Sequence, residues 1–233
     1  MIQGLSFKKI QLLNVRVKTA YDEKEKVVEG YFHEKKLSYA GFQLFIMGFK
    51  REQKLEVWIN EKGKDTYSLL HVYDFCSSSG TLGPKRKEGD LQIPEGIYEI
   101  NHFNPESNFY LSLGINYPNK ADKILGDPNH PGSSIYIHGN CVTIGCIPIT
   151  DEKIKELYVL AVEARNNGQK KIPVYIFPDR LDAGVIEKLS LPYLADQALI
   201  QFWKSLQPVY ADFKSTKKVK DIVVNDQGVY SLR

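Results

Sequence analysis

The sequence lacks a long apolar run. A membrane-spanning helix needs roughly 18 or more consecutive apolar residues, and no stretch of this chain reaches that length. The first ten residues, from Met1 to Ile10, also lack the continuous apolar core of a signal peptide. Two locations remain open: the protein is cytosolic, or it works outside the cytoplasm and its leader is absent from this chain.

Neither sign of charge dominates the chain. Its 31 Lys and Arg residues and 28 Asp and Glu residues leave a formal net charge of +3, which is too small to indicate binding to nucleic acid. The sequence has no P-loop and no glycine fingerprint of a dinucleotide-binding fold, and it contains no repeats or low-complexity segments. Neither nucleic acid nor a cofactor is therefore expected.

Cysteine is scarce, with three residues in all: Cys76, Cys141 and Cys146. An odd number cannot pair completely within one chain, so at least one thiol is free or joins another molecule. A disulfide between Cys141 and Cys146 stays open as an alternative, because only a short loop separates them, and it would block Cys146. With His130 and His138 added, the spacing still matches no common zinc-ligand pattern, so no metal is expected.

What the sequence does contain is a succession of short β-type segments. A chain of 233 residues can form one large core. Apolar patterns predict strands at 42–49, 55–59, 66–75 and 96–103, an aromatic strand beginning at Asn108, and strands at 135–137 and 172–177. Helical periodicity predicts helices over 17–37, 150–168 and 199–213, with a closing hairpin of 219–224 and 229–232. The expected fold class is mainly β with α additions.

One stretch, residues 134–151, brings chemically capable side chains to the ends of predicted elements. Its buried strand ends at His138, and Gly139 lets the chain turn there. Further on, Gly145 precedes Cys146, shortly before a predicted helix start. An imidazole and a thiol are therefore expected close to each other, where strand gives way to loop and backbone N–H groups are available.

This arrangement suits nucleophilic catalysis. A cysteine becomes a good nucleophile beside a base or when its pKa is lowered, and His138 would be the base for Cys146. The backbone amides of Gly145 and Cys146 would form an oxyanion hole. The alternative is that both side chains are ordinary packed residues. Packing alone gives no evident reason for glycine directly after the histidine and directly before the cysteine, so the pattern favours catalysis.

The motif His138-Gly139 followed by Thr143-x-Gly145-Cys146 resembles the signature of the YkuD-type L,D-transpeptidases, which act on peptidoglycan. The short spacing is most similar to the YafK-like branch. Upstream, a loop rich in small and basic residues leads into a Pro94-x-Gly96-x-Tyr98 strand, which is also similar to that branch. The resemblance covers roughly residues 40–215.

The resemblance implies an architecture and a location. It implies an L,D-transpeptidase-like twisted sheet or open barrel with the cysteine at its rim and helices at its flanks. The expected domains are a helical extension at 1–40, the catalytic domain at 41–180, and C-terminal helices and a hairpin packed on that domain at 181–233. Because the substrate of the family lies outside the cytoplasmic membrane, a periplasmic or cell-envelope location is expected, with the leader absent from this chain.

The resemblance also implies a reaction. Cys146 would attack an amide of a peptidoglycan stem peptide, with His138 as base and then as acid and a backbone carbonyl near Gly139 orienting the imidazole. The acyl group would pass to an amine, which is L,D-transpeptidation. Two alternatives stay open: a hydrolase of the same family, either an L,D-carboxypeptidase or an amidase that releases wall-linked peptide or protein, and a non-catalytic cell-wall binding module with an inert Cys146.

Two departures from the family pattern affect substrate binding. Thr143 stands where many members carry serine and keeps the hydroxyl, whereas Pro148 replaces an arginine that would clamp a substrate carboxylate. Compensating contacts are expected from Lys85 and Arg86, although a basic run in such a loop also fits a purely solvated segment. Further substrate contacts are expected from a polar, aromatic segment that also fits simple core packing, namely Tyr110, Asn116 and Tyr117.

Overall fold

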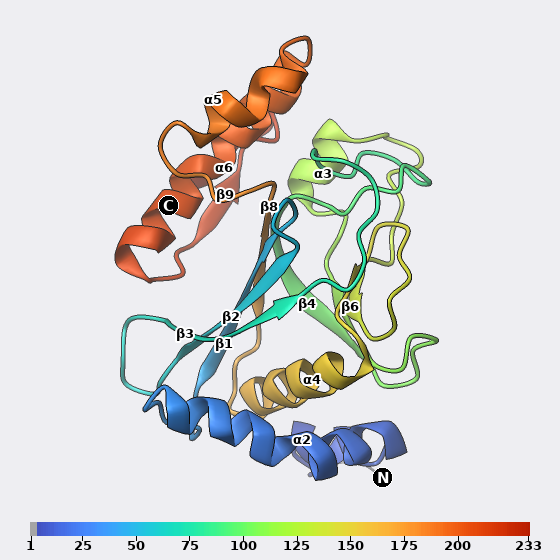
Figure 1. The fold of residues 1–233 in the computed structure, drawn as a ribbon, viewed down its shortest axis with the longest axis vertical. Coiled ribbons are helices and arrows are strands. Elements are labelled where there is room, and N and C mark those ends of the chain that lie inside the picture. Colours follow the sequence, from blue (N-terminus) through green and yellow to red (C-terminus); the bar gives the residue numbers. More distant parts are fainter. Residues whose placement is uncertain (1–3) are drawn as a thin grey trace.

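The computed structural model describes residues 4–233 and shows one twisted, curled sheet with helices packed against it (Figure 1). The eight strands follow the order β3-β2-β1-β8-β4-β5-β6-β7. Neighbours are antiparallel except β1–β8 and β6–β7, which are parallel. The predicted mainly β class with added helices is confirmed. The strands are β1 (Gln43–Phe49), β2 (Lys54–Asn60), β3 (Ser68–Asp74), β4 (Gly96–Asn104), β5 (Ser112–Ile115), β6 (Tyr136–His138), β7 (Ile147–Pro148) and β8 (Pro173–Phe177).

Helices lie on opposite sides of the sheet (Figure 1). α2 packs on α4, which lies against the sheet, while α6 and the β9–β10 hairpin are on the other side. No helix within residues 4–233 is both long and apolar enough to cross a membrane. The helices are α1 (Phe7–Gln11), α2 (Val15–Glu34), α3 (Lys120–Leu125), α4 (Asp151–Asn166), α5 (Val185–Ser190) and α6 (Gln197–Thr216), a 3-10 turn spans Leu191–Tyr193, and the hairpin strands are β9 (Ile222–Val224) and β10 (Tyr230–Leu232).

Strand β1 is buried on both of its faces. Leu44 and Ile46 belong to the core that α2 and α4 cover, whereas Phe45 and Met47 belong to a second core under α6. Side chains alternate along a strand, so a strand covered on both faces needs an apolar residue at nearly every position. This double coverage explains why the sequence of β1 is continuously apolar rather than alternating.

The aromatic strand predicted from Asn108 is wrong in its start, because β5 begins only at Ser112. Tyr110 has a φ of +72°, in the left-handed region, and therefore lies in a loop rather than in extended chain. The helix predicted over 17–37 ends early, at Glu34, since Lys36 also has a positive φ of 56°. The short helices α1, α3 and α5 were not predicted, although a capping box of Asn119 and Asp122 marks the start of α3.

The three predicted domains correspond to different layers of the molecule. α1 and α2 lie within 1–40, the sheet lies within 41–180, and α5, α6 and the hairpin lie within 181–233. Residues 1–3 of the predicted N-terminal extension lie outside the described residues. Both flanking segments bury apolar side chains against the same sheet. The division into a catalytic domain and two additions stays a prediction.

A buried ion pair joins the end of β1, the loop before β4 and helix α6. Lys50 Nζ lies 3.0 Å from Glu95 Oε1, and the two side chains are 3% and 0% exposed. Lys50 also donates to the carbonyls of Gly83 and Ile93. Glu95 accepts one hydrogen bond from the Gly83 N–H and one from Trp203 Nε1, each at 2.7 Å. Burial lowers the pKa of Lys50, and the charge of Glu95 opposes that shift. Charge-assisted hydrogen bonds thus hold α6 to the loop.

Replacing Glu95 with Gln should leave the Lys50 ammonium buried without an anion. We expect the free energy of unfolding to fall by about 3–5 kcal/mol, the usual effect of removing one partner of a buried pair. Urea unfolding followed by circular dichroism measures it. Asp226→Asn is the matched control, because Asp226 pairs with Lys120 at the surface with a fully exposed side chain, and its unfolding midpoint should not move. Equal midpoints for both variants would contradict the assigned role of the buried pair.

Candidate active site

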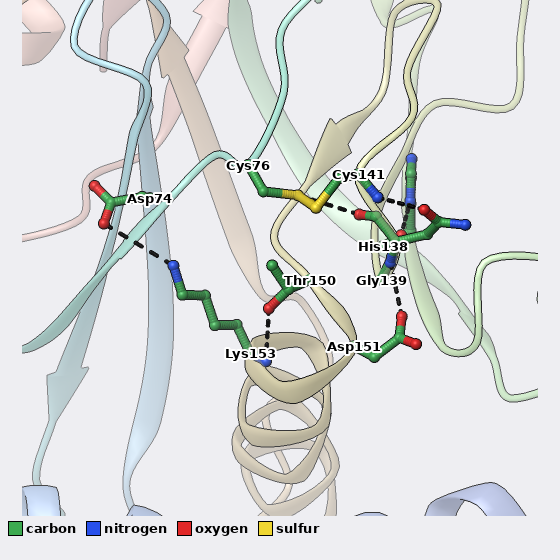
Figure 2. Close-up of a disulfide and its surroundings, with 9 residues drawn as sticks. Asp74, Cys76, His138, Gly139, Cys141, Thr150, Asp151 and Lys153 are labelled. Atoms are coloured by element: carbon green, nitrogen blue, oxygen red, sulfur yellow. Dashed lines mark hydrogen bonds and ion pairs between the residues drawn. A yellow bond between two sulfur atoms is a disulfide. The ribbon is translucent and has the colours of Figure 1, made fainter.

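His138 ends strand β6 and is held on two sides. The residue is 1% exposed, and the ring of Phe109 stacks on its imidazole at 4.5 Å between centroids. Nδ1 is hydrogen-bonded to the carbonyl oxygen of Gly139, which can only accept, so Nδ1 carries the proton in the neutral ring. Nε2 is then the unprotonated nitrogen and the available base. Figure 2 shows Gly139 in the loop directly after His138, the last residue of β6.

Cys146 immediately precedes strand β7 and shares a sheet face with His138. The parallel register pairs Ile137 with Ile147, and both isoleucines are fully buried in the core. Because side chains alternate along a strand, Cys146 and His138 lie on the opposite face from these isoleucines. Cys146 lies beside Tyr136, whose N–H donates to its Sγ at 3.4 Å. The thiol donates to the Ser134 carbonyl at 3.8 Å. The strand register therefore places the two residues that the sequence singled out on one face of the sheet, with no hydrogen bond between them in the described structure.

Burial controls the protonation of both groups. It raises the pKa of the Cys146 thiol, which the Tyr136 N–H and the charge of Lys85 only partly offset. Burial lowers the pKa of His138, with a smaller opposite effect from the Gly139 carbonyl. The resting pair is therefore a neutral thiol and a neutral imidazole at pH 7. Deprotonation of this thiol near neutral pH would therefore require a base.

The two glycines of the motif have packing reasons that the sequence alone did not indicate. A Cβ at Gly139 would lie 2.4 Å from Asp151 Oδ1 and 2.7 Å from the Phe109 carbonyl oxygen. Gly145 has a φ of +136°, and a Cβ there would lie 3.0 Å from the Gln92 carbonyl oxygen. Both positions therefore require glycine for close backbone approach, whatever the chemistry.

The predicted oxyanion donors differ in availability. The Gly145 N–H donates to Thr143 Oγ1 at 3.1 Å, and the same hydroxyl donates to the Cys146 carbonyl at 2.8 Å. Thr143 therefore braces the loop, and the Gly145 amide is already engaged. The Cys146 N–H makes no hydrogen bond to another described residue, so it is the freer of the two donors.

A disulfide links Cys76, just after β3, to Cys141 in the loop that follows His138 (Figure 2). Its Cα atoms are 5.4 Å apart, and Cys146 is the free thiol. The alternative of a Cys141–Cys146 disulfide is therefore wrong, because Cys141 has another partner. The Cys76 N–H also donates to the Pro148 carbonyl at 2.9 Å, so the segment after β3 is fixed against β7.

Asp151, the first residue of α4, clamps the same loop. Its Oδ1 accepts the Asn140 N–H at 2.7 Å (Figure 2). Asp151 is also an acid in the first turn of α4, where it suits the positive end of the helix dipole. Its second role depends on a contact between residues 11 positions apart, for which the motif gave no signal.

The basic residues predicted to bind substrate have different surroundings. Lys85 is 4% exposed and paired with Asp90 at 2.7 Å, so it is not a solvated loop residue. It lies near enough to Cys146 to affect the pKa of the thiol. Arg86 is half-buried, with its guanidinium 4.8 Å from the ring centre of Phe202. The structure therefore brings Lys85 toward Cys146 and packs Arg86 against α6.

The three predicted polar and aromatic contacts are largely occupied within the fold. The Tyr110 carbonyl accepts a hydrogen bond from Arg16. The Asn116 side chain accepts one from the Glu99 N–H. Tyr117 is buried, and its hydroxyl donates to the Pro131 carbonyl at 2.7 Å. Asn116 and Tyr117 thus brace the scaffold beside α3, whereas Tyr110 follows directly after Phe109. No three His, Cys, Asp or Glu side chains within residues 4–233 form a metal-binding group.

Known proteins resemble this chain in sequence, and solved structures match part of it. The model of the L,D-transpeptidase catalytic domain family matches residues 45–176. YafK of Escherichia coli (strain K12), provisionally named an L,D-transpeptidase, is 34% identical over 194 residues, which cover 82% of this chain and 75% of that protein. The helical cell shape determining protein Pgp2 from Campylobacter jejuni is 20% identical at a TM-score of 0.47, over 81% of this chain and 75% of that one. Bd1075 from Bdellovibrio bacteriovorus is 23% identical at a TM-score of 0.42, over 74% and 71%.

Thiol labelling of the native protein should distinguish the three cysteines. Without reductant, iodoacetamide should modify Cys146 alone, slowly at pH 7 and faster as the pH approaches the raised pKa of the thiol. Mass spectrometry of tryptic peptides measures the modification, and after reduction in denaturant all three cysteines should react. Cys146→Ala is the control and should take no label. Labelling of Cys76 or Cys141 in the unreduced protein would contradict the disulfide.

Proposed function

The chain belongs to the L,D-transpeptidase catalytic domain family, and on that basis we propose that it is a cysteine-dependent acyltransferase acting on stem peptides of peptidoglycan. One observation carries the proposal. Cys146 is a free thiol on the same sheet face as a histidine whose Nδ1 is fixed by a backbone carbonyl, which leaves Nε2 as a base.

The first half of the reaction forms a thioester. The Cys146 thiol gives its proton to His138 Nε2, and Sγ attacks the carbonyl carbon of a stem-peptide amide. The Cys146 N–H stabilises the negative oxygen of the tetrahedral intermediate. As that intermediate collapses, the imidazolium returns the proton to the leaving amine. The Gly139 carbonyl stabilises the imidazolium through Nδ1–H, so no carboxylate is needed for this purpose.

The second half decides between transfer and hydrolysis. An acceptor amine or a water molecule attacks the thioester, with His138 taking its proton and then giving it to the departing thiolate. Pro148 is buried in β7, where it offers no cation to a substrate carboxylate. Without this charge-assisted contact to the substrate carboxylate, a second function is favoured, that of a hydrolase that releases wall-linked peptide or protein.

A location in the cell envelope accords with this function. The family acts on peptidoglycan, and disulfides persist mainly in oxidising compartments. The Cys76–Cys141 disulfide lies beside the proposed site rather than at a remote position. We therefore propose that the protein works in the periplasm or an equivalent envelope space.

Replacing Cys146 with Ala should abolish product formation from isolated sacculi, by about 1,000-fold or more, because it removes the nucleophile. Liquid chromatography with mass spectrometry detects the products, and defined muropeptides with and without an added amine distinguish transfer from hydrolysis. Thermal unfolding controls for folding. If the variant keeps full activity, the assignment of Cys146 is wrong. If neither the wild type nor the variant forms product but both bind sacculi, the binding module is correct.

Lys85 and Arg86 should give different results when neutralised separately. Lys85→Gln leaves Asp90 without its cation and should lower stability by about 1–3 kcal/mol, while Arg86→Gln should raise KM for the stem peptide several-fold with little change in kcat. Lys87→Gln is the matched control, because that exposed side chain makes no hydrogen bond to a described residue. An unchanged KM in Arg86→Gln would remove Arg86 from the site.

A further inference from the structure

The ring of Phe109 closes the outer side of His138. The two rings are stacked, with 4.5 Å between their centroids and 27° between their planes. His138 is 1% exposed, whereas Phe109 is 37% exposed, so Phe109 lies between the imidazole and solvent. Neither residue is adjacent to the other in sequence, and Phe109 belongs to no motif of the family signature.

Phe109 lies in a loop whose conformation is not set by the sheet. The loop connects β4 to β5, and Tyr110 within it has a φ of +72°. A non-glycine residue in the left-handed region costs roughly 1–2 kcal/mol, so other contacts must maintain this conformation. The Phe109 N–H donates to Ser107 Oγ at 3.1 Å, and the Gly139 N–H donates to the Leu111 carbonyl at 3.2 Å.

Arg16 provides the strongest restraint on this loop. Its Nη1 donates to the carbonyl of Ser107 at 2.7 Å and to the carbonyl of Tyr110 at 2.8 Å. These two carbonyls lie on either side of Phe109 in the chain, so a single charged group fixes the backbone before and after it. Arg16 lies in the first turn of α2. Helix α2 is therefore connected to His138 through the loop that carries Phe109.

We propose that Phe109 is a positioning residue for His138 and that Arg16 positions the loop that carries it. The hydrogen bond at Nδ1 fixes one edge of the imidazole, and the stacked ring fixes its plane. Together they restrict rotation of the ring, so that Nε2 stays on the face shared with Cys146. The inference rests on the proposed function in that His138 acts as the base.

The stack also controls the hydration of the imidazole. Burial is the main cause that lowers the pKa of His138, and the Gly139 carbonyl opposes it. Cys146 lies on the same sheet face as His138, Asp151 at the start of α4 bonds the Asn140 N–H, and Lys155 of α4 lies 5.9 Å from the Tyr110 ring centre. Arg16 from α2 lies beyond Tyr110. Removing Phe109 admits water and should therefore raise the pKa of His138 toward its ordinary value of about 6.5.

Four variants test the proposal: Phe109→Ala, Phe109→Tyr, Arg16→Gln and Lys18→Gln. The titration of His138 is followed by NMR and assigned with His138→Gln, while kcat and KM are measured on stem peptides. Phe109→Ala should raise the pKa of His138 and lower kcat about 10- to 100-fold with little change in KM. Phe109→Tyr keeps the ring and should retain both values. Arg16→Gln should change the pKa of His138 and kcat in the same directions as Phe109→Ala does. Lys18→Gln is the control and should match the wild type, because Lys18 is an exposed cation in the same helix turn.

The titration separates this inference from the proposed function, because it needs no activity. An unchanged pKa of His138 in Phe109→Ala would overturn the role of Phe109. A shifted pKa in Phe109→Ala with no shift in Arg16→Gln would remove Arg16 from the proposal. Full activity of His138→Gln would overturn the proposed base, while the titration would still report whether Phe109 orders the ring.

Discussion

The pairing of two very short parallel strands determines where the reactive groups stand. β6 and β7 are in register with Ile137 opposite Ile147, and both side chains are fully buried. Alternation then leaves Cys146 and His138 on the other face, and a slip of one residue would turn the thiol into the core. Burying an isoleucine is worth about 1.5–3 kcal/mol, so two apolar side chains maintain the register on which the proposed chemistry depends.

Segments distant in sequence converge on this register. Arg16 of α2 bonds the β4–β5 loop, Phe109 of that loop stacks on His138, and Asp151 of α4 bonds the Asn140 N–H. The side chains that position the site are therefore spread over three elements, while the groups proposed to react come from one short stretch. Such support from rigid elements keeps an active site in a productive geometry without motion of the reacting residues.

Most strands, though not β7, and the proposed pair of Cys146 and His138 could be predicted because each depends on a local pattern. A continuous apolar run indicated β1, helical periodicity indicated α4, and the order of glycine, histidine and cysteine indicated Cys146 and His138 as candidates. The partner of Cys141 was not predictable, because Cys76 is 65 positions away and only the sheet brings the two together. The same limit applies to Phe109, whose loop is held by Arg16 from a distant helix. Interactions that cross the fold leave no periodic signal in the sequence.

The disulfide determines which of the three thiols stays free under oxidising conditions. Three cysteines allow three different single pairings, and two of them would consume Cys146. The pairing of Cys76 with Cys141 occupies the cysteine that lies nearest to Cys146 in the chain. In an oxidising environment, this is the one pairing that leaves the Cys146 thiol free, because the other two cysteines are already bonded to each other.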